Sequence, residues 1–291
     1  MLLNASGCLD ALTAPDVARS LDAFVTKTVT PEPREGNEPP RIAETDQGML
    51  NSIGLQNPGI KSFLKDVLPQ LKQLGIPIWV SVGGFSAAEY ASTCAQLSDV
   101  TIELNLSCPN VDEAPESAAE IVAACRAATP LPIYTKLSPQ LPDIAEVARA
   151  VEAVGADGLS LVNTLRGLAL DQRTLRPRLG RGTGGLSGPA LKPSALAAVF
   201  VCWRVTNLPI VGMGGVWNGP DALELIAAGA SSVALGTVLF SDPWAPVRVR
   251  RELHSAADAV GLSDPWTAVG IAHDPVLSGE TTEKMPAFLP N

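Results

Sequence analysis

One cysteine of this chain stands in a setting that suggests chemistry. The segment LNLSCPNV (104–111) follows an apolar, strand-like run and places Cys108 between Asn105 and Asn110. A thiol with an ordinary pKa of about 8.5 can act as a base once its thiolate is partly populated near neutral pH. The alternative is an inert buried thiol, but a polar turn at a strand end favours a catalytic role. Cys108 is therefore the first candidate catalytic residue.

Two lysines also end apolar runs, Lys27 after AFVT and Lys136 after PIYT. Burying an ammonium group is costly unless an anion meets it. The pattern therefore predicts an anionic ligand near both lysines.

The elements that must position these residues alternate regularly along the chain. Runs such as IPIWVSV and SSVAL are apolar almost throughout, which is typical of strands buried on both faces of a parallel sheet. Gly or Pro separates most helical runs from the next strand. We predict strands at 1–4, 23–27, 77–82, 100–105, 132–137, 157–162, 208–213 and 231–235. Helices are predicted near 58–75, 86–98, 115–128, 142–154, 190–206, 218–228 and 243–259, with one short helix within 9–22.

This alternation predicts a single-domain α/β fold, a (β/α)8 TIM barrel. The alternative is an open, doubly wound sheet, but NASGCL after the first strand is a poor match to the phosphate fingerprint of that fold. We expect the barrel to span 1–262, with an irregular, Pro- and Gly-rich active-site insert at 30–59. Residues 263–291 are expected to form a C-terminal tail.

Composition limits the partners and the compartment. The formal net charge of −9 disfavours nucleic acid as a partner. No apolar run is long enough to span a bilayer, and the first residues lack the basic region of a secretory signal. The five cysteines are scattered, without metal-ligand spacing or the pattern of a disulfide framework. We therefore expect a cytoplasmic protein with no membrane partner and no metal site.

Glycine-rich turns follow the last predicted strands, where barrels of this kind usually bind phosphate. GMGGVWNGPDALE (212–224) is expected to present free backbone N–H groups at a helix start. LGTVLFSD (235–242) and GTGGLSGPALKP (182–193) add further turns on the same rim. A flavin mononucleotide (FMN) would fit such a phosphate site, with its ring over the barrel mouth.

Eight segments together carry a resemblance to a known family. VTKT, MLNSIGLQNPG, ELNLSCPN, TKLSP, LSLVNT, TGGLSGPALKP, VGMGG and ALGT occur in this order between residue 4 and about residue 240. They resemble the class 1 dihydroorotate dehydrogenases. SIGLQNPG and TVTPEPREGN are more similar to the NAD-linked class 1B type than to the fumarate-linked type.

The resemblance implies oxidation of dihydroorotate to orotate in pyrimidine (UMP) biosynthesis, with FMN as cofactor. A hydride would pass to flavin N5 while Cys108 removes a proton as general base, and Lys136 would lie beside the N1/C2 edge of the flavin. Substrate binding is implied for Lys27, Asn51, Ile53, Gly54, Leu55, Asn105, Asn110, Asn163 and Thr164. Flavin binding is implied for Ala5, Ser6, Gly7, Lys27, Thr28, Asn105, Lys136, Val162, Ser187, Gly188, Gly214, Gly215, Gly236 and Thr237.

The resemblance also implies partners and leaves two alternatives. A homodimer is expected, and the class 1B type works with a second subunit that carries FAD and an iron–sulfur cluster. One alternative is a related FMN-dependent dihydropyrimidine or uracil reductase, which would not need groups for a carboxylate. The other is a non-catalytic flavin- or phosphate-binding barrel.

Overall fold

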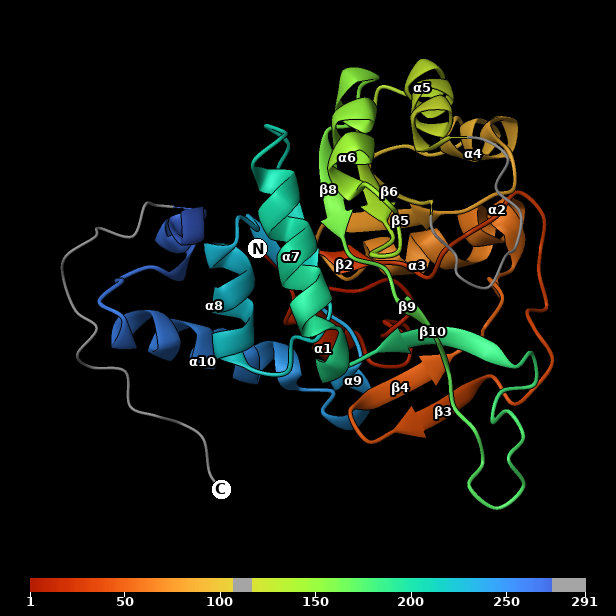
Figure 1. Cartoon of the computed structure of the whole chain (residues 1–291). Helices are drawn as coiled ribbons and strands as arrows, with labels where there is room; N and C mark the ends of the chain where they lie inside the picture. The colour runs from red at the N-terminus through yellow and green to blue at the C-terminus, as the bar shows by residue number, and fades with distance from the viewer. Residues whose placement is uncertain (107–116, 274–291) are drawn as a thin grey trace.

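The computed structural model describes residues 1–106 and 117–273. Its centre is a sheet of eight parallel strands in the spatial order β1-β12-β11-β8-β7-β6-β5-β2, and a parallel bridge between Leu3 and Ala23 joins its two ends. The sheet is therefore a closed barrel, and all eight predicted strands are confirmed (Figure 1). The strands are β1 (Leu2–Asn4), β2 (Phe24–Val25), β5 (Ile78–Val82), β6 (Thr101–Asn105), β7 (Ile133–Leu137), β8 (Gly158–Leu161), β11 (Ile210–Met213) and β12 (Ser232–Leu235).

Helices surround the barrel at the predicted places, and one further short helix, α9, was not predicted. They are α1 (Pro15–Arg19), α2 (Gly59–Ser62), α3 (Leu68–Lys72), α4 (Ala87–Cys94), α5 (Ala118–Ala128), α6 (Ile144–Ala153), α7 (Lys192–Trp203), α8 (Gly219–Ala227), α9 (Val238–Ser241) and α10 (Ala245–Ala259). The predicted helix 58–75 is divided, because a π-helical segment, Phe63–Val67, separates α2 from α3. Pro69 explains this division, since it has no N–H to donate to the preceding turn.

Two apolar layers hold the barrel together. The larger one lies between strands and helices and contains side chains such as Ile102, Leu159 and Val199. The smaller one fills the barrel interior with residues that include Leu3, Trp79 and Val211. The closed interior therefore forms a packed floor beneath the C-terminal ends of the strands.

A second sheet, which the sequence patterns did not predict, lies beside the barrel. Its antiparallel strands have the order β3 (Ile42–Thr45), β4 (Gly48–Asn51), β10 (Thr183–Ser187) and β9 (Leu165–Leu168). Figure 1 shows the hairpin β3–β4 next to β10. The insert at 30–59 was expected to be irregular. This expectation is wrong for part of it, because β3 and β4 form a hairpin that pairs with β10, a strand that follows β8 in the chain.

The chain after α10 packs back onto the barrel. Short 3-10 turns at Pro265–Ala268 and Ile271–His273 follow α10. The ring of His273 stacks on Phe200 and Trp203 of α7, with centroid separations of 4.0 and 4.2 Å. Residues 274–291, the rest of the expected tail, lie outside the described residues, and the boundary at 262 stays a prediction. Within the described ranges, no helix is long and apolar enough to cross a membrane.

Candidate active site

A cavity of about 240 Å³ opens at the C-terminal ends of the barrel strands. Every predicted site residue in the described part of the chain lines it, although the residues come from both sheets and from many loops. Cys108 and Asn110 lie outside the described residues. The lining residues that were predicted are Ala5, Ser6, Gly7, Lys27, Thr28, Asn51, Ile53, Gly54, Leu55, Asn105, Lys136, Val162, Asn163, Thr164, Ser187, Gly188, Gly214, Gly215, Gly236 and Thr237.

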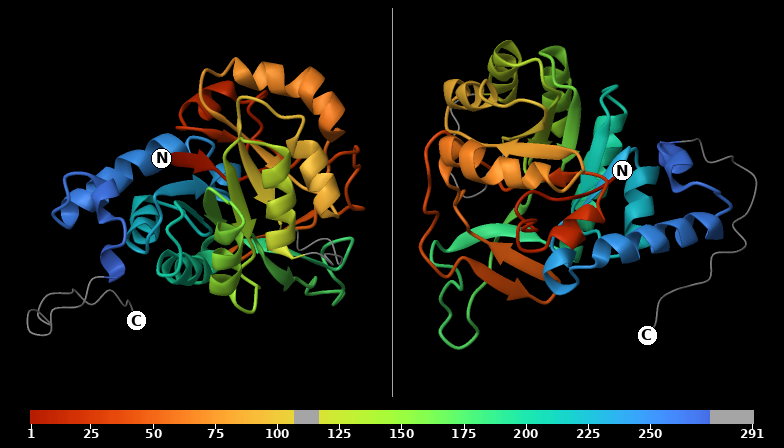
Figure 2. Two further views of the ribbon diagram at one scale, coloured as in Figure 1. Left: turned by 90° about the horizontal axis from the view of Figure 1, so that it is seen from above. Right: turned by 180° about the vertical axis from the view of Figure 1, so that it is seen from behind.

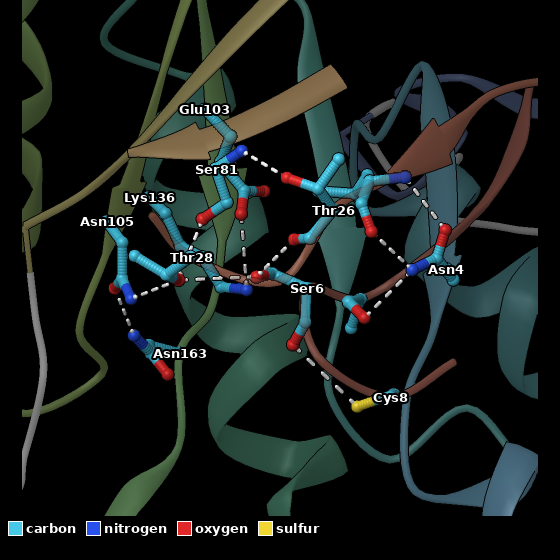
Figure 3. A network of polar contacts seen from close by, with 12 residues as sticks. Asn4, Ser6, Cys8, Thr26, Thr28, Ser81, Glu103, Asn105, Lys136 and Asn163 are labelled. Atoms are coloured by element: carbon cyan, nitrogen blue, oxygen red, sulfur yellow. Dashed lines mark hydrogen bonds and ion pairs between the residues drawn. The ribbon is translucent and has the colours of Figure 1, made fainter. Parts of the chain in front are cut away.

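A chain of hydrogen bonds fixes the amides on one side of the cavity (Figure 3). Asn163 Nδ2 donates to Asn105 Oδ1 at 2.9 Å, and Asn105 Nδ2 donates to Thr28 Oγ1 at 3.1 Å. Thr28 in turn lies 3.0 Å from the hydroxyl of Ser81 in β5. Because each amide has a fixed neighbour, its orientation is set before any ligand binds.

The antiparallel sheet supplies the opposite wall. Asn51 is the last residue of β4 and pairs with Gly185 of β10, to whose carbonyl it also donates a side-chain hydrogen bond at 3.4 Å. Ser187, at the end of β10, accepts a hydrogen bond of 2.8 Å from the hydroxyl of Thr237. The contact joins β10 to the loop after β12, so this sheet is part of the site.

The charge of the cavity is opposite to that of the whole chain. Lys27 and Lys136 line it, and no aspartate or glutamate of the described residues does so. Lys136 is largely buried, with 7% of its side chain exposed. An anion is the ligand that two lysines in a partly enclosed cavity favour.

Two glycines of the cavity wall differ in the space beside them. A Cβ built on Gly236 would have Ala5 Cβ and Cys8 Sγ as its nearest neighbours, at 3.6 and 3.8 Å. A Cβ on Gly7 would lie 3.1 Å from Lys27 Nζ. Gly236 therefore leaves space at the cavity wall, whereas a side chain at Gly7 would press against Lys27.

The expected donors at the start of α8 are not free. Asp221 Oδ2 accepts hydrogen bonds from the backbone N–H groups of Trp217 and Asn218, at 2.9 and 3.2 Å. Gly219 N donates to Glu252 Oε2 at 3.0 Å, and Asp221 N donates to the Asn218 side chain. The expectation of free N–H groups at this helix start is therefore wrong, because its own capping box and Glu252 satisfy them. The N–H groups of Trp217, Asn218, Gly219 and Asp221 are therefore not available to a ligand.

Several lining residues were not predicted. Most are apolar, and three of them, Ile42, Trp217 and Phe240, are also exposed at the surface. Cys8 is the one thiol among them; burial raises its pKa, although the positive charges of Lys136 and Lys27 oppose this. For some of these residues the only sequence signal was a position just after a predicted strand, and Ile42, Met49 and Leu191 lacked even that. The residues are Cys8, Ile42, Met49, Leu191, Met213, Val216, Trp217, Val238 and Phe240.

A closed parallel barrel with a polar, positively charged cavity at its C-terminal rim defines a (β/α)8 enzyme that acts on an anionic ligand. The fold agrees with solved structures of DHODH from Eimeria tenella. The ligand-free form has a TM-score of 0.78 at 23% identity and covers 94% of this chain and 89% of that chain. The complex with ferulenol has a TM-score of 0.76 at 23% identity, covering 94% and 85%.

Sequence comparison identifies the family. A family model described as dihydroorotate dehydrogenase matches residues 1–256. The catalytic subunit of dihydroorotate dehydrogenase B (NAD(+)) from Listeria monocytogenes serovar 1/2a is 46% identical over 254 residues, 84% of each chain. The subunit of the same name from Latilactobacillus sakei subsp. sakei is 49% identical over 257 residues, again 84% of each chain. The chain belongs to the dihydroorotate dehydrogenase family, and its reaction is the oxidation of dihydroorotate to orotate in pyrimidine biosynthesis.

Proposed function

We propose that the cavity binds FMN and dihydroorotate together and that its residues hold the two in position for the oxidation. The observation that carries this proposal is the composition of the lining: two lysines, three amides and glycine-rich turns, with no carboxylate among the described residues. When bound, FMN supplies the acceptor for a hydride from the substrate ring.

The residues present fit FMN. Gly236 leaves the space described above, and Gly214 and Gly215 have positive φ values of 117° and 78°, which a residue with a side chain rarely adopts. Backbone groups of Gly214, Gly215, Gly236 and Thr237 would hold the phosphate. The rest of the flavin site would be Ala5, Ser6, Gly7, Lys27, Thr28, Asn105, Lys136, Val162, Ser187 and Gly188.

Lys136 would stabilise negative charge at the flavin ring. Its ammonium group is fixed on a barrel strand, and little of it is open to solvent. A fixed cation in a partly enclosed site acts more strongly than one in water.

The substrate site would use the amides of Asn51, Asn105 and Asn163, which both donate and accept hydrogen bonds as the orotate ring requires. Gly54 and Leu55 follow one another with positive φ values of 77° and 57°. Successive N–H groups in such a turn form a concave anion site, which suits the carboxylate. Lys27, Ile53 and Thr164 would complete this site, together with Asn110 outside the described residues.

The general base is proposed to be Cys108, from its motif alone, since it lies outside the described residues. It would accept the proton that leaves the substrate carbon next to the one that loses hydride. The substrate thus loses two hydrogens, one as hydride and one as a proton, to become orotate.

The electron acceptor is proposed to be NAD+, reached through a second subunit that carries FAD and an iron–sulfur cluster. The relatives are named as catalytic subunits of an NAD(+) enzyme, which supports a separate electron-transfer subunit. A homodimer of this chain is part of the same proposal.

An anaerobic titration tests the proposal. The purified protein is reconstituted with FMN and titrated with dihydroorotate, and we expect the flavin absorbance to bleach as orotate forms. Bleaching by dihydrouracil, but not by dihydroorotate, would instead support a pyrimidine reductase. A protein that stays colourless after reconstitution, or that does not bleach with either compound, would overturn the proposal. NAD+ added afterwards should restore the absorbance only with the second subunit present.

A further inference from the structure

A buried carboxylate lies directly behind one of the two lysines of the cavity. Glu103 belongs to β6, and its Oε1 lies 3.6 Å from Lys136 Nζ of the neighbouring strand β7. Only 1% of the Glu103 side chain is exposed. Glu103 precedes Asn105 by two residues, so both side chains point to the same face of the strand. Asn105 lines the cavity and Glu103 does not, which places Glu103 one level deeper in the barrel (Figure 3).

The pair is poorly arranged as a structural salt bridge. At 3.6 Å the two groups are beyond hydrogen-bond distance, and Glu103 Oε1 has no hydrogen-bond partner among the described residues. A buried ion pair offsets the desolvation of its charges only with close geometry and further hydrogen bonds. The stability of the barrel therefore does not explain this carboxylate, whereas the Coulomb interaction with Lys136 persists without a direct bond.

We propose that Glu103 is a positioning residue that sets, through Lys136, the positive charge that the bound flavin experiences. This inference rests on the proposed function of the cavity. Lys136 favours negative charge on the flavin, and the carboxylate behind it opposes that effect. Glu103 therefore holds the flavin midpoint potential lower than Lys136 alone would, so the flavin gives up its electrons more readily to the next acceptor.

The test compares the flavin midpoint potential of reconstituted wild-type protein with those of Glu103→Gln and Glu103→Met. Both variants remove the charge and nearly preserve the size of the side chain. In both neutral variants we expect a higher midpoint potential than in wild type. At one solution potential the ratio of reduced to oxidised flavin should rise at least tenfold, which corresponds to a midpoint shift of about 30 mV for a two-electron couple. Glu103→Asp keeps the charge and should remain closer to wild type than either neutral variant.

Ser160→Ala is the matched control. Ser160 lies opposite Lys136 in β8, is fully buried, and its hydroxyl also has no hydrogen-bond partner among the described residues. Its removal changes a polar group near the same lysine without changing charge, so the potential should stay at the wild-type value.

Three results would overturn the inference, and they are distinguishable. If wild-type protein and variants bind FMN and have the same potential, Glu103 does not tune the flavin, although the proposed function stands. If Ser160→Ala shifts the potential as much as the neutral Glu103 variants, the shift reflects altered packing and not charge. A wild-type protein that binds no FMN would overturn both the inference and the proposed function.

Discussion

Two cysteines concern the chemistry of the cavity, and they are expected to behave differently. Cys108 is the proposed base, whereas Cys8 lines the cavity beside Gly236. Burial raises the pKa of the Cys8 thiol above its ordinary value, and the nearby lysines only reduce this effect. Cys8 is therefore protonated near neutral pH and cannot serve as a base there.

Cys108→Ala should lower turnover by about 10²- to 10⁴-fold, the usual contribution of a general base, while FMN remains bound. The measurements are steady-state oxidation of dihydroorotate and the flavin spectrum of the purified variant. Cys8→Ala is the matched control and should retain most of its turnover. Near-normal turnover in Cys108→Ala, or a comparable loss in Cys8→Ala, would assign the base elsewhere.

Among the residues that line the cavity, the polar ones could be predicted from the sequence better than the apolar ones. Lysines and asparagines at strand ends are noticeable because they interrupt apolar runs, and the barrel brings those ends together. Met213 ends β11 and Phe240 lies in the short helix α9 after β12, but their types are common in any core. Nothing in their spacing separates a cavity wall from ordinary packing.

The antiparallel sheet supplies one wall of the site, and sequence patterns did not predict it. Its strands are short, and β10 (TGGLS) lacks both β-branched runs and strict alternation. Strand signals of this length are weak, and the pairing of β4 with β10 joins residues more than 130 positions apart. The barrel strands, in contrast, were predictable because burial on both faces makes them apolar throughout.

Gly48 is where β4 approaches the end of β10 most closely. A Cβ at Gly48 would lie 2.0 Å from the carbonyl oxygen of Ser187, so Gly48→Ala must push the two strands apart. We expect weaker binding of FMN and orotate and a loss of more than about 1 kcal/mol in the free energy of unfolding. Fluorescence titration and urea denaturation would measure both.

Gly182→Ala is the control for backbone strain alone. Gly182 has a φ of +83°, and nothing lies within 4 Å of its added Cβ. It precedes β10 directly, so it should lose stability through strain but keep ligand affinity. Equal losses of affinity in both variants would show that Gly48 does not act through the contact with Ser187.

Helix α7 has a buried thiol, that of Cys202, where it packs against α6. Cys202 is fully buried, with Sγ 3.8 Å from the carbonyl oxygen of Ile144. Burial, assisted by the negative charge of Asp143, raises the pKa of Cys202 from 9.0 to about 12. The native state therefore keeps this proton while the unfolded chain loses it between pH 9 and 12.

The stability that this proton contributes is fully present below pH 9 and is lost as the pH rises toward 12. The decline has a limiting slope of about 1.4 kcal/mol per pH unit for one proton. Cys202→Ala removes the group, so its free energy of unfolding should fall less steeply than that of wild type over this range. Parallel curves from urea denaturation at successive pH values would contradict the assignment.

The molecule as a whole depends on closing a ring of strands where the first strand meets the second. Strand β2 has only two residues, and Leu3 and Ala23 form a single bridge to β1. The side chain of Asn4 adds two hydrogen bonds between β1 and β2. Its Oδ1 accepts from Val25 N at 2.8 Å, and its Nδ2 donates to Val25 O at 2.7 Å. This fully buried amide thus takes the place of backbone hydrogen bonds between the two strands.

A second contact supports the same junction from outside. Asp22 accepts a hydrogen bond from Leu2 N at 2.7 Å and pairs with Arg250 of α10 at 2.9 Å. Figure 2 shows from behind that the N-terminal segment lies beside this last long helix. Side chains from both ends of the chain therefore hold the junction, which explains why short strands suffice to close the barrel.

Asn4→Ala should open this junction. The change leaves the N–H and C=O of Val25 buried without partners, and each unsatisfied group costs about 1–3 kcal/mol. We therefore expect the free energy of unfolding to fall by about 2–4 kcal/mol, with weaker FMN binding because Ala5, Ser6 and Gly7 follow directly. Asn207→Ala, an exposed asparagine, should change stability by less than about 0.5 kcal/mol. If urea denaturation gave the two variants the same midpoint, the closure would not depend on the Asn4 amide, and the bridge at Leu3 with the Asp22 contacts would have to hold the ring by themselves.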